Sequence, residues 1–226
     1  MANSLCLSHP GMRLAALLAV LLLGGCQSAY YGTLEQLGYH KRDLLISRVE
    51  SARDGLRAAG TQFQATLDRF AAVVNVQGGE LRDRHEALSD EYDASRDRAA
   101  AARKRIDAVD SVAGALFGDW QAELAAYNDA GLRRRSAQQL ADARRRYDRL
   151  IAALRRAGEK MDPVLAAFGD QVLFLKHNLN AQAVASLQDE RVAMEANVAA
   201  LVRDLEAAIA EAEAFLQTLA VEPNAT

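Results

Sequence analysis

Proline and aromatic side chains are scarce in this sequence. It holds only three prolines and 6% aromatic residues, whereas charged residues make up 25% of its 226 positions. Sheet-based folds draw on aromatic and β-branched residues, while alanine, leucine, arginine and glutamate favour helices. The composition therefore predicts long helices and argues against a β-sandwich or a doubly wound sheet.

Motifs of the common enzyme and nucleotide-binding classes are also missing. The sequence contains no G-x-x-x-x-G-K-[ST] phosphate loop, no G-x-S-x-G and no H-E-x-x-H. His40, His85 and His177 lie in different segments, and His85 falls on an apolar stripe, where a core histidine with a satisfied hydrogen bond is the simpler interpretation. A net charge of -3 gives no basis for a nucleic-acid partner. We therefore expect no enzyme, no cofactor and no metal site.

One of the two cysteines follows an apolar run near the start of the chain. Leu14 to Leu23 contains only leucine, alanine and valine. It is shorter than the roughly 20 residues that span a bilayer, but suits the apolar region of a signal peptide. Only Arg13 precedes it as a positive charge, and Met12 is as good a start of translation as Met1.

The end of this run, Leu23-Gly24-Gly25-Cys26, resembles the lipobox of bacterial lipoproteins. The resemblance implies a signal peptide over residues 1–25, an acylated Cys26, and a short tether over residues 26–32. Several acyl chains hold a protein stably on a membrane. Gln27, in place of the aspartate that retains enterobacterial lipoproteins in the inner membrane, implies the periplasmic face of the outer membrane. The alternative is an ordinary secretory signal with a chance cysteine. Loss of Cys6 on cleavage would exclude an intramolecular disulfide.

Apolar residues over 33–220 recur every three or four positions, as in helices that pack along their length. Many of these positions are alanine, which favours antiparallel helices in close contact. The four stripes are Val49, Ala52, Leu56, Ala59, Phe63, Thr66, Phe70 and Val73; Leu81, His85, Leu88, Tyr92, Ser95, Ala99, Ala102, Ile106, Val109, Ala113, Leu116 and Trp120; Arg133, Ala137, Leu140, Arg144, Tyr147, Ile151, Leu154, Gly158, Met161, Leu165, Phe168, Val172, Leu175 and Leu179; and Leu187, Arg191, Met194, Val198, Leu201, Leu205, Ala208, Ala212, Phe215 and Leu219.

The breaks between the stripes determine the number of helices. Gly78-Gly79, the stretch 128–131 and the stretch 178–180 are turn sequences, with Asn180 as an N-cap. They predict an all-α, antiparallel coiled-coil rod of four helices, followed by a disordered tail over 221–226. Asp162-Pro163 offers another helix start, and breaks at 78 and 162 alone would give three helices. We favour four, because the stripe passes Pro163 without a change of phase.

Charge is segregated between two segments. Residues 133–160 hold ten lysines and arginines against three acids, and residues 189–222 hold eight acids against two arginines. The simpler interpretation is that these helices are neighbours whose flanking charges pair. The other is a basic helix face that lies on anionic lipid.

Two clusters of polar side chains are candidate interaction sites. Tyr39, His40 and Arg42 lie near the start of the helical region, and Lys176, His177, Asn178 and Asn180 follow the apolar run VLFL. Buried amides that fix helix register would explain the second cluster, and a site for a partner is the alternative. We expect the helix that carries the VLFL run to be buried, Asn178 and Asn180 to be partnered within the protein, and Lys176 or His177 to be exposed.

Long peptides of the chain resemble one family. CQSAYYGTLEQLGYHKRDLLISRVESARD, VVNVQGGEL, ALFGDW, MDPVLAAF and VLFLKHNLNAQAVASL look like the DUF2959 family of uncharacterised proteobacterial proteins. The resemblance extends from about Tyr30 to Leu219. It implies no activity, because the family has no established function.

These observations predict a protein anchored in membrane lipid through Cys26, which acts as a periplasmic spacer, scaffold or interaction module of the cell envelope. An envelope protein is the expected partner, and the sequence leaves a homo-oligomer open. The alternative function is a peripheral helical module that binds or shapes membranes through basic helix faces.

Overall fold

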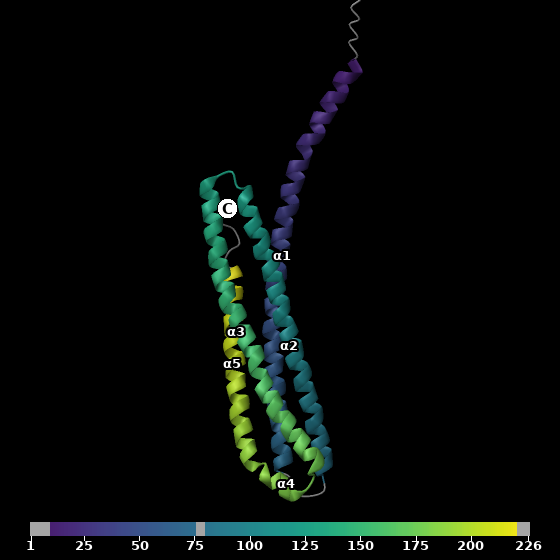
Figure 1. Ribbon diagram of the computed structural model, residues 1–226, viewed down its shortest axis with the longest axis vertical. Coiled ribbons are helices and arrows are strands. Elements are labelled where there is room, and N and C mark those ends of the chain that lie inside the picture. The colour runs from purple at the N-terminus through teal and green to yellow at the C-terminus, as the bar shows by residue number, and fades with distance from the viewer. Residues whose placement is uncertain (1–9, 76–79, 221–226) are drawn as a thin grey trace, which may run out of the picture.

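The computed structural model describes residues 10–75 and 80–220, with the side chains of residues 40–75, 80–180 and 182–219. Four long α-helices make up nearly all of this part of the chain (Figure 1). The elements are α1 (Pro10–Val74), α2 (Leu81–Glu123), the 3-10 turn η1 (Leu124–Ala126), α3 (Ala130–His177), the short α4 (Ala181–Ser186) and α5 (Gln188–Ala220).

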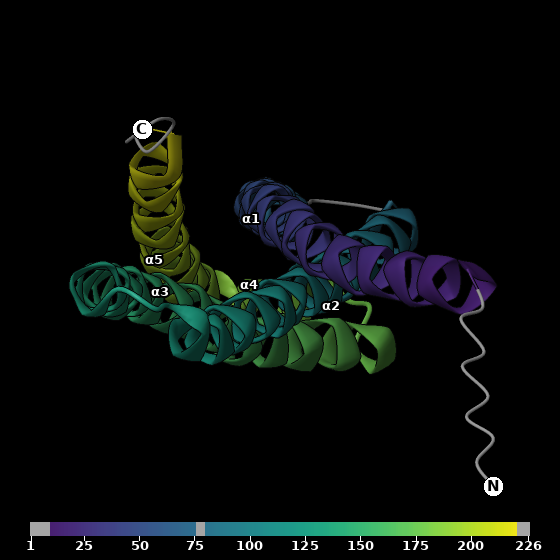
Figure 2. The same cartoon turned by 90° about the horizontal axis from the view of Figure 1, so that it is seen from above.

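The long helices form one antiparallel bundle. α1 packs against α2 and α5, and α3 packs against the same two helices, so that the four surround a common core (Figure 2). α2 meets α3 at the end from which the N-terminal part of α1 extends, here called the near end (Figure 1). The far end holds the connections from α1 to α2 and from α3 through α4 to α5. With 48 residues, α3 is about 70 Å long.

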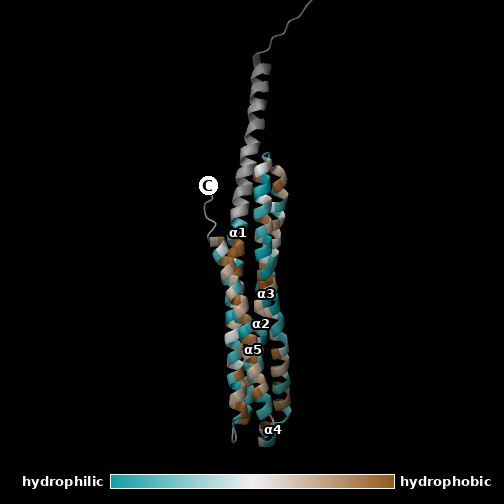
Figure 3. Ribbon diagram, turned by 90° about the vertical axis from the view of Figure 1, so that its left-hand side faces the viewer, coloured by the Kyte–Doolittle hydropathy of each residue, from teal (hydrophilic) through white to brown (hydrophobic). Residues whose placement is uncertain are grey.

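The predicted stripe of α1 is fully confirmed as core. Its eight residues, from Val49 to Val73, are each completely buried. Alanines at its centre bring the α1 backbone close to α2, where Ala99, Ala102 and Ala113 are buried as well. Hydrophobic and hydrophilic residues therefore alternate along each helix in Figure 3, since only one stripe of each faces the core.

The prediction for α3 is wrong at both ends of its stripe. Arg133 and Leu179 are exposed. Leu219, near the end of α5, accepts a hydrogen bond from Arg42 of α1. The preceding residue, Lys41, pairs with Asp119 of α2. The end of α5 therefore lies at about the level of Asp119. α2 continues beyond Asp119 before α3 begins, so the first turns of α3 extend past the end of α5. Leu179 lies in the connection after α3, outside the helical packing.

Pro163 lies inside α3 and does not end it. Met161 and Val164 on either side of it are buried, whereas Pro163 is exposed. Asp162 forms an ion pair with Arg103 of α2 and does not cap a helix. The three-helix alternative, with an end at residue 162 and a continuous helix at 178, is therefore wrong. Proline inside a helix costs about 3 kcal/mol, which the core contacts on both sides offset.

The ends of the helices match the predicted breaks. α1 ends at Val74 and α2 begins at Leu81; Gly78-Gly79 between them lies outside the described residues. Asp129 caps α3, where its side chain accepts a hydrogen bond from the Leu132 amide at 2.7 Å. The tail over 221–226 and the segment 1–9 also lie outside the described residues.

A buried hydroxyl pair joins α1 to α2 in the middle of the apolar core. Thr66 and Ser95 are both completely buried, and their side-chain oxygens lie 2.8 Å apart. Thr66 Oγ1 also lies 2.9 Å from the carbonyl oxygen of Glu91 in α2 and 3.1 Å from that of Gln62 in its own helix. Polar groups in a core are tolerated when each has a partner, and such a pair favours one register between the two helices.

We expect Thr66→Val to lower the free energy of unfolding by about 1–3 kcal/mol, because it leaves the buried Ser95 hydroxyl without its cross-helix partner. It also removes one of the two side-chain donors to the Glu91 carbonyl oxygen, the other being Gln62 Nε2 at 3.3 Å. The double variant Thr66→Val/Ser95→Ala should cost less than the sum of the two single variants, since it removes both ends of the bond. Urea unfolding of the four chains measures this. Strict additivity would show that the two hydroxyls do not act as a pair.

Candidate interaction sites at the two ends of the bundle

The predicted cluster at the start of the helical region lies at the near end of the bundle. His40 is exposed, and the side chain of Tyr39 lies outside the described residues. Lys41 forms an ion pair with Asp119 of α2, and the half-buried Arg42 donates a hydrogen bond to the carbonyl oxygen of Leu219 in α5. Lys41 and Arg42 therefore join α1 to both of its neighbours. Of the cluster's described residues, His40 is the one that the fold leaves open to solvent.

The second predicted cluster lies at the far end, where α3 turns into α4. Asn178 Nδ2 donates to the carbonyl oxygen of Phe174 at 2.9 Å, which closes the last turn of α3. Asn180 Oδ1 accepts from the Ala183 amide at 2.9 Å and caps α4. Lys176 and His177 are exposed. The predicted N-cap and the expected partners of Asn178 and Asn180 are confirmed. The interpretation of the cluster as buried amides that fix helix register is wrong, because Asn180 is exposed and its side chain bonds to a backbone amide of the turn that it caps.

Three large apolar side chains beside this cluster are exposed, contrary to the expected burial of the VLFL segment. The exposed fraction is 57% for Leu173, 39% for Phe174 and 38% for Leu179, while Leu175 is fully buried. Successive helical residues point about 100° apart, so four apolar residues in a row cannot all face one core. A run of four apolar residues in a helix is therefore itself a signal of partial exposure.

His85 has the hydrogen-bond partner that was predicted, but it is half-buried and not part of the core. Its Nε2 lies 3.0 Å from the carbonyl oxygen of Val172, and the bond joins the first turns of α2 to the last turns of α3. Within the described side chains, no group of three or more histidine, cysteine, aspartate and glutamate residues is placed to hold a metal ion. The described residues also contain no helix with both the length and the apolarity for crossing a membrane.

The two polar clusters do not meet. They lie at opposite ends of the part of α1 that packs within the bundle. His40 is close to the near end, and α1 reaches the far end at Val74. There the carbonyl oxygen of Val74 accepts a hydrogen bond at 3.2 Å from the side chain of Gln188, the first residue of α5. The bundle therefore separates them by about 50 Å along α1, at about 1.5 Å per residue.

Arginines in the middle of α3 are used mainly against α2. Arg155 Nη2 lies 2.8 Å from Asp110 of α2, whose other carboxylate oxygen accepts from the Tyr147 hydroxyl at 2.6 Å. Burial and this hydrogen bond raise the pKa of Tyr147. Arg144 lies over the ring of Phe117, 5.9 Å from its centre. The expected pairing with α5 is present as well, in Arg149–Glu211 at 3.9 Å.

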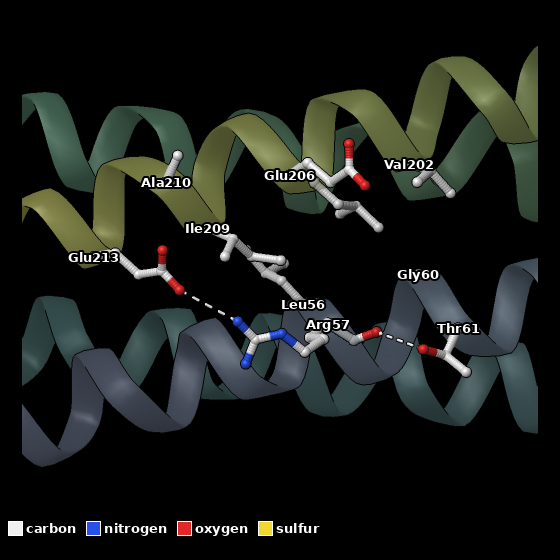
Figure 4. A pocket seen from close by; sticks show the side chains of 10 residues that line it. Leu56, Arg57, Gly60, Thr61, Val202, Glu206, Ile209, Ala210 and Glu213 are labelled. Carbon is white, nitrogen blue, oxygen red and sulfur yellow. Dashed lines mark hydrogen bonds and ion pairs between the residues drawn. The ribbon is translucent and has the colours of Figure 1, made fainter.

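A shallow groove of about 380 Å³ runs between α1 and α5 (Figure 4). Its lining includes the small residues Gly60 of α1 and Ala210 of α5. Leu56, Val202 and Ile209 form an apolar floor, and an ion pair of 3.3 Å between Arg57 and Glu213 crosses the groove. Nothing in this lining joins an acid, a base and a nucleophile in one place.

Comparison with known proteins gives one family. The family described as "Protein of unknown function (DUF2959)" matches residues 30–219, a range that includes both ends of the bundle. No curated protein and no solved structure matches the chain. Because the match covers most of the sequence, the chain belongs to the DUF2959 family, as its sequence motifs indicate.

Proposed function

We propose that this protein is a lipid-anchored spacer on the periplasmic face of the outer membrane, which holds an interaction site away from the lipid. The observation that carries the proposal is the polarity of the bundle. The helix that contains Cys26 extends from the near end, and the exposed apolar residues Leu173, Phe174 and Leu179 lie at the far end with Lys176 and His177.

The far end has the composition of a protein-binding surface. Exposed apolar side chains with polar neighbours mark binding sites more often than isolated ones do, and Leu173, Phe174 and Leu179 fall within seven residues of each other. The partner that suits them is an envelope protein with an apolar surface and acidic groups for Lys176. The bundle supplies a stiff support, because each long helix packs against two others.

Binding through a basic helix face is less well supported. It needs a row of free cations along α3, yet Arg144, Arg149 and Arg155 contact Phe117, Glu211 and Asp110 within the bundle. The spacer proposal requires no such row.

The anchor is tested by Cys26→Ser. We expect this variant to lose acyl labelling and to move from the membrane fraction to the soluble fraction, because the thiol that takes the lipid is gone. Cys6→Ser is the matched control: it lies in the predicted signal peptide and should change neither result. Unchanged membrane partition of Cys26→Ser, together with no acyl mass on the unaltered protein, would rule out the anchor.

The far-end site is tested by two neighbouring substitutions with different structural roles. His177→Ala removes an exposed side chain and should leave the free energy of unfolding unchanged while weakening the partner contact. Asn180→Leu removes the cap of α4 and should cost about 0.5–2 kcal/mol. Urea unfolding gives the stabilities.

A photoreactive residue at position 173 reports the partner contact in living cells, and one at the exposed Ala100 in the middle of α2 is the control. We expect a defined adduct from position 173, weaker with His177→Ala, and none from position 100. If His177→Ala unfolds the protein as much as Asn180→Leu, or if both positions give the same adducts, the far end is not the interaction site.

A further inference from the structure

The connection from α2 to α3 forms a tip at the near end, with its own exposed apolar side chains. Tyr127 is 39% exposed and Leu132 is 46% exposed. Three exposed arginines, Arg133, Arg134 and Arg135, follow directly in the first turns of α3. These five residues are called the near-end tip. They are open to solvent because α5 ends before it reaches this level.

The three arginines of the tip have no partner among the described residues, unlike Arg144, Arg149 and Arg155 farther along α3. Of the acids at this end of the bundle, Asp129 caps α3 through Leu132 and Asp119 pairs with Lys41. Glu123, in the last turn of α2, forms no ion pair with the three arginines. A guanidinium group is well suited to phosphate, because its planar N–H groups donate two parallel hydrogen bonds. The tip therefore presents three guanidinium groups with which no carboxylate of the described residues forms an ion pair.

The arginines also lean in one direction along the helix axis, although they are consecutive and point to different sides of it. Each Cα–Cβ bond in a helix tilts towards the N-terminus. The N-terminus of α3 lies at the tip, so the three side chains lean towards the near end whichever face of the helix they occupy. Their spread around the helix would weaken a binding stripe along the rod, but not a contact at its end.

The register of α1 and α2 places this tip close to Cys26. The ion pair between Lys41 and Asp119 puts these two residues at the same level. From there, Tyr127 lies about 12 Å farther towards the near end and Cys26 about 22 Å farther, at about 1.5 Å per residue. The tip and the N-terminal part of α1 extend in the same direction (Figure 1). A lipid surface at Cys26 would thus lie about 10 Å from the tip, and closer if α1 is inclined to the membrane.

We propose that the near-end tip contacts the surface of a membrane that contains anionic lipid, and this rests on the proposed lipid anchor. Arg133, Arg134 and Arg135 bind lipid phosphates, and Tyr127 and Leu132 enter the interface between headgroups and acyl chains, where amphipathic and apolar side chains are stabilised. An acylated Cys26 alone leaves the rod free to swing. The tip adds a second point of contact, which fixes the inclination of the rod and directs the far end away from the lipid.

A fluorescent probe at Asn128 tests the contact without altering the five residues. The mature chain that the proposed cleavage leaves, residues 26–226, carries Cys26→Ser and Asn128→Cys, the second labelled with an environment-sensitive dye. An N-terminal histidine tag holds the chain on vesicles that contain nickel-chelating lipid, so the result does not depend on acylation. We expect a blue shift on vesicles of phosphatidylcholine with phosphatidylglycerol, none on phosphatidylcholine alone, and reversal of the shift at high salt.

The triple variant Arg133→Gln/Arg134→Gln/Arg135→Gln should abolish the shift. Its matched control is Arg82→Gln/Arg98→Gln/Lys104→Gln, which removes three exposed cations of α2 and should keep it. A second probe at Gln182→Cys, in α4 at the far end, should give no shift.

Three results would each overturn the proposal. One is an equal shift on both vesicle types, and another is a full shift in the triple arginine variant. The third is an equal shift at both probe positions, because the rod would then lie flat on the membrane. The lipid and salt dependence of the unaltered tip decides the question even if the triple variant folds poorly. Failure of the anchor is read separately, from the acyl labelling of Cys26.

Discussion

The close contact between α1 and α2 is the constraint on which the rest of the structure depends. Alanines such as Ala52, Ala59, Ala99 and Ala102 are completely buried between these helices, so the backbones approach closely and little apolar area is available per residue. Many turns kept in phase are then needed for a stable core, which accounts for the length of the helices. The same closeness explains why the polar pair Thr66 and Ser95 fits inside the core.

Small residues perform a related role where α3 meets α2. A side-chain carbon on Gly169 would lie 2.7 Å from the hydroxyl of Tyr92, so that glycine is what lets the tyrosine lie across α3. At Gly158, Arg103 passes close enough to donate to the carbonyl oxygen at 3.3 Å and reaches Asp162 one turn farther along. These contacts lie on both sides of Pro163. They keep α3 straight enough to continue past a residue that would end a helix supported only by its own hydrogen bonds.

The periodicity of the sequence predicted the core of the bundle, and the turn residues predicted its four helices. Residues from Val49 to Val73 are buried as expected, and Asn180 caps α4. The exposure of Arg133, Leu173 and Phe174 was not predicted, for two different reasons. A repeat identifies the stripe of a helix that faces its neighbours, but it carries no information on where those neighbours stop, and Arg133 is exposed because α5 ends before reaching its level. Leu173 and Phe174 are exposed because consecutive residues of a helix cannot all face one core, and Leu175 beside them is the one that is fully buried.

Unequal helix lengths also make the two ends different in kind. At the near end, Lys41 and Arg42 bind α1 to α2 and α5 at the level where α5 ends. The helix that bears Cys26 is therefore held by both of its neighbours at the point from which it extends beyond the bundle. At the far end, His85 holds α2 to the last turns of α3, next to the exposed Leu173 and Phe174. On the proposed anchoring, the inclination of α1 at the membrane therefore determines the direction of the whole rod. A second lipid contact at the near-end tip would then set the position of the far-end surface, about 50 Å away along α1, because each long helix packs against two others.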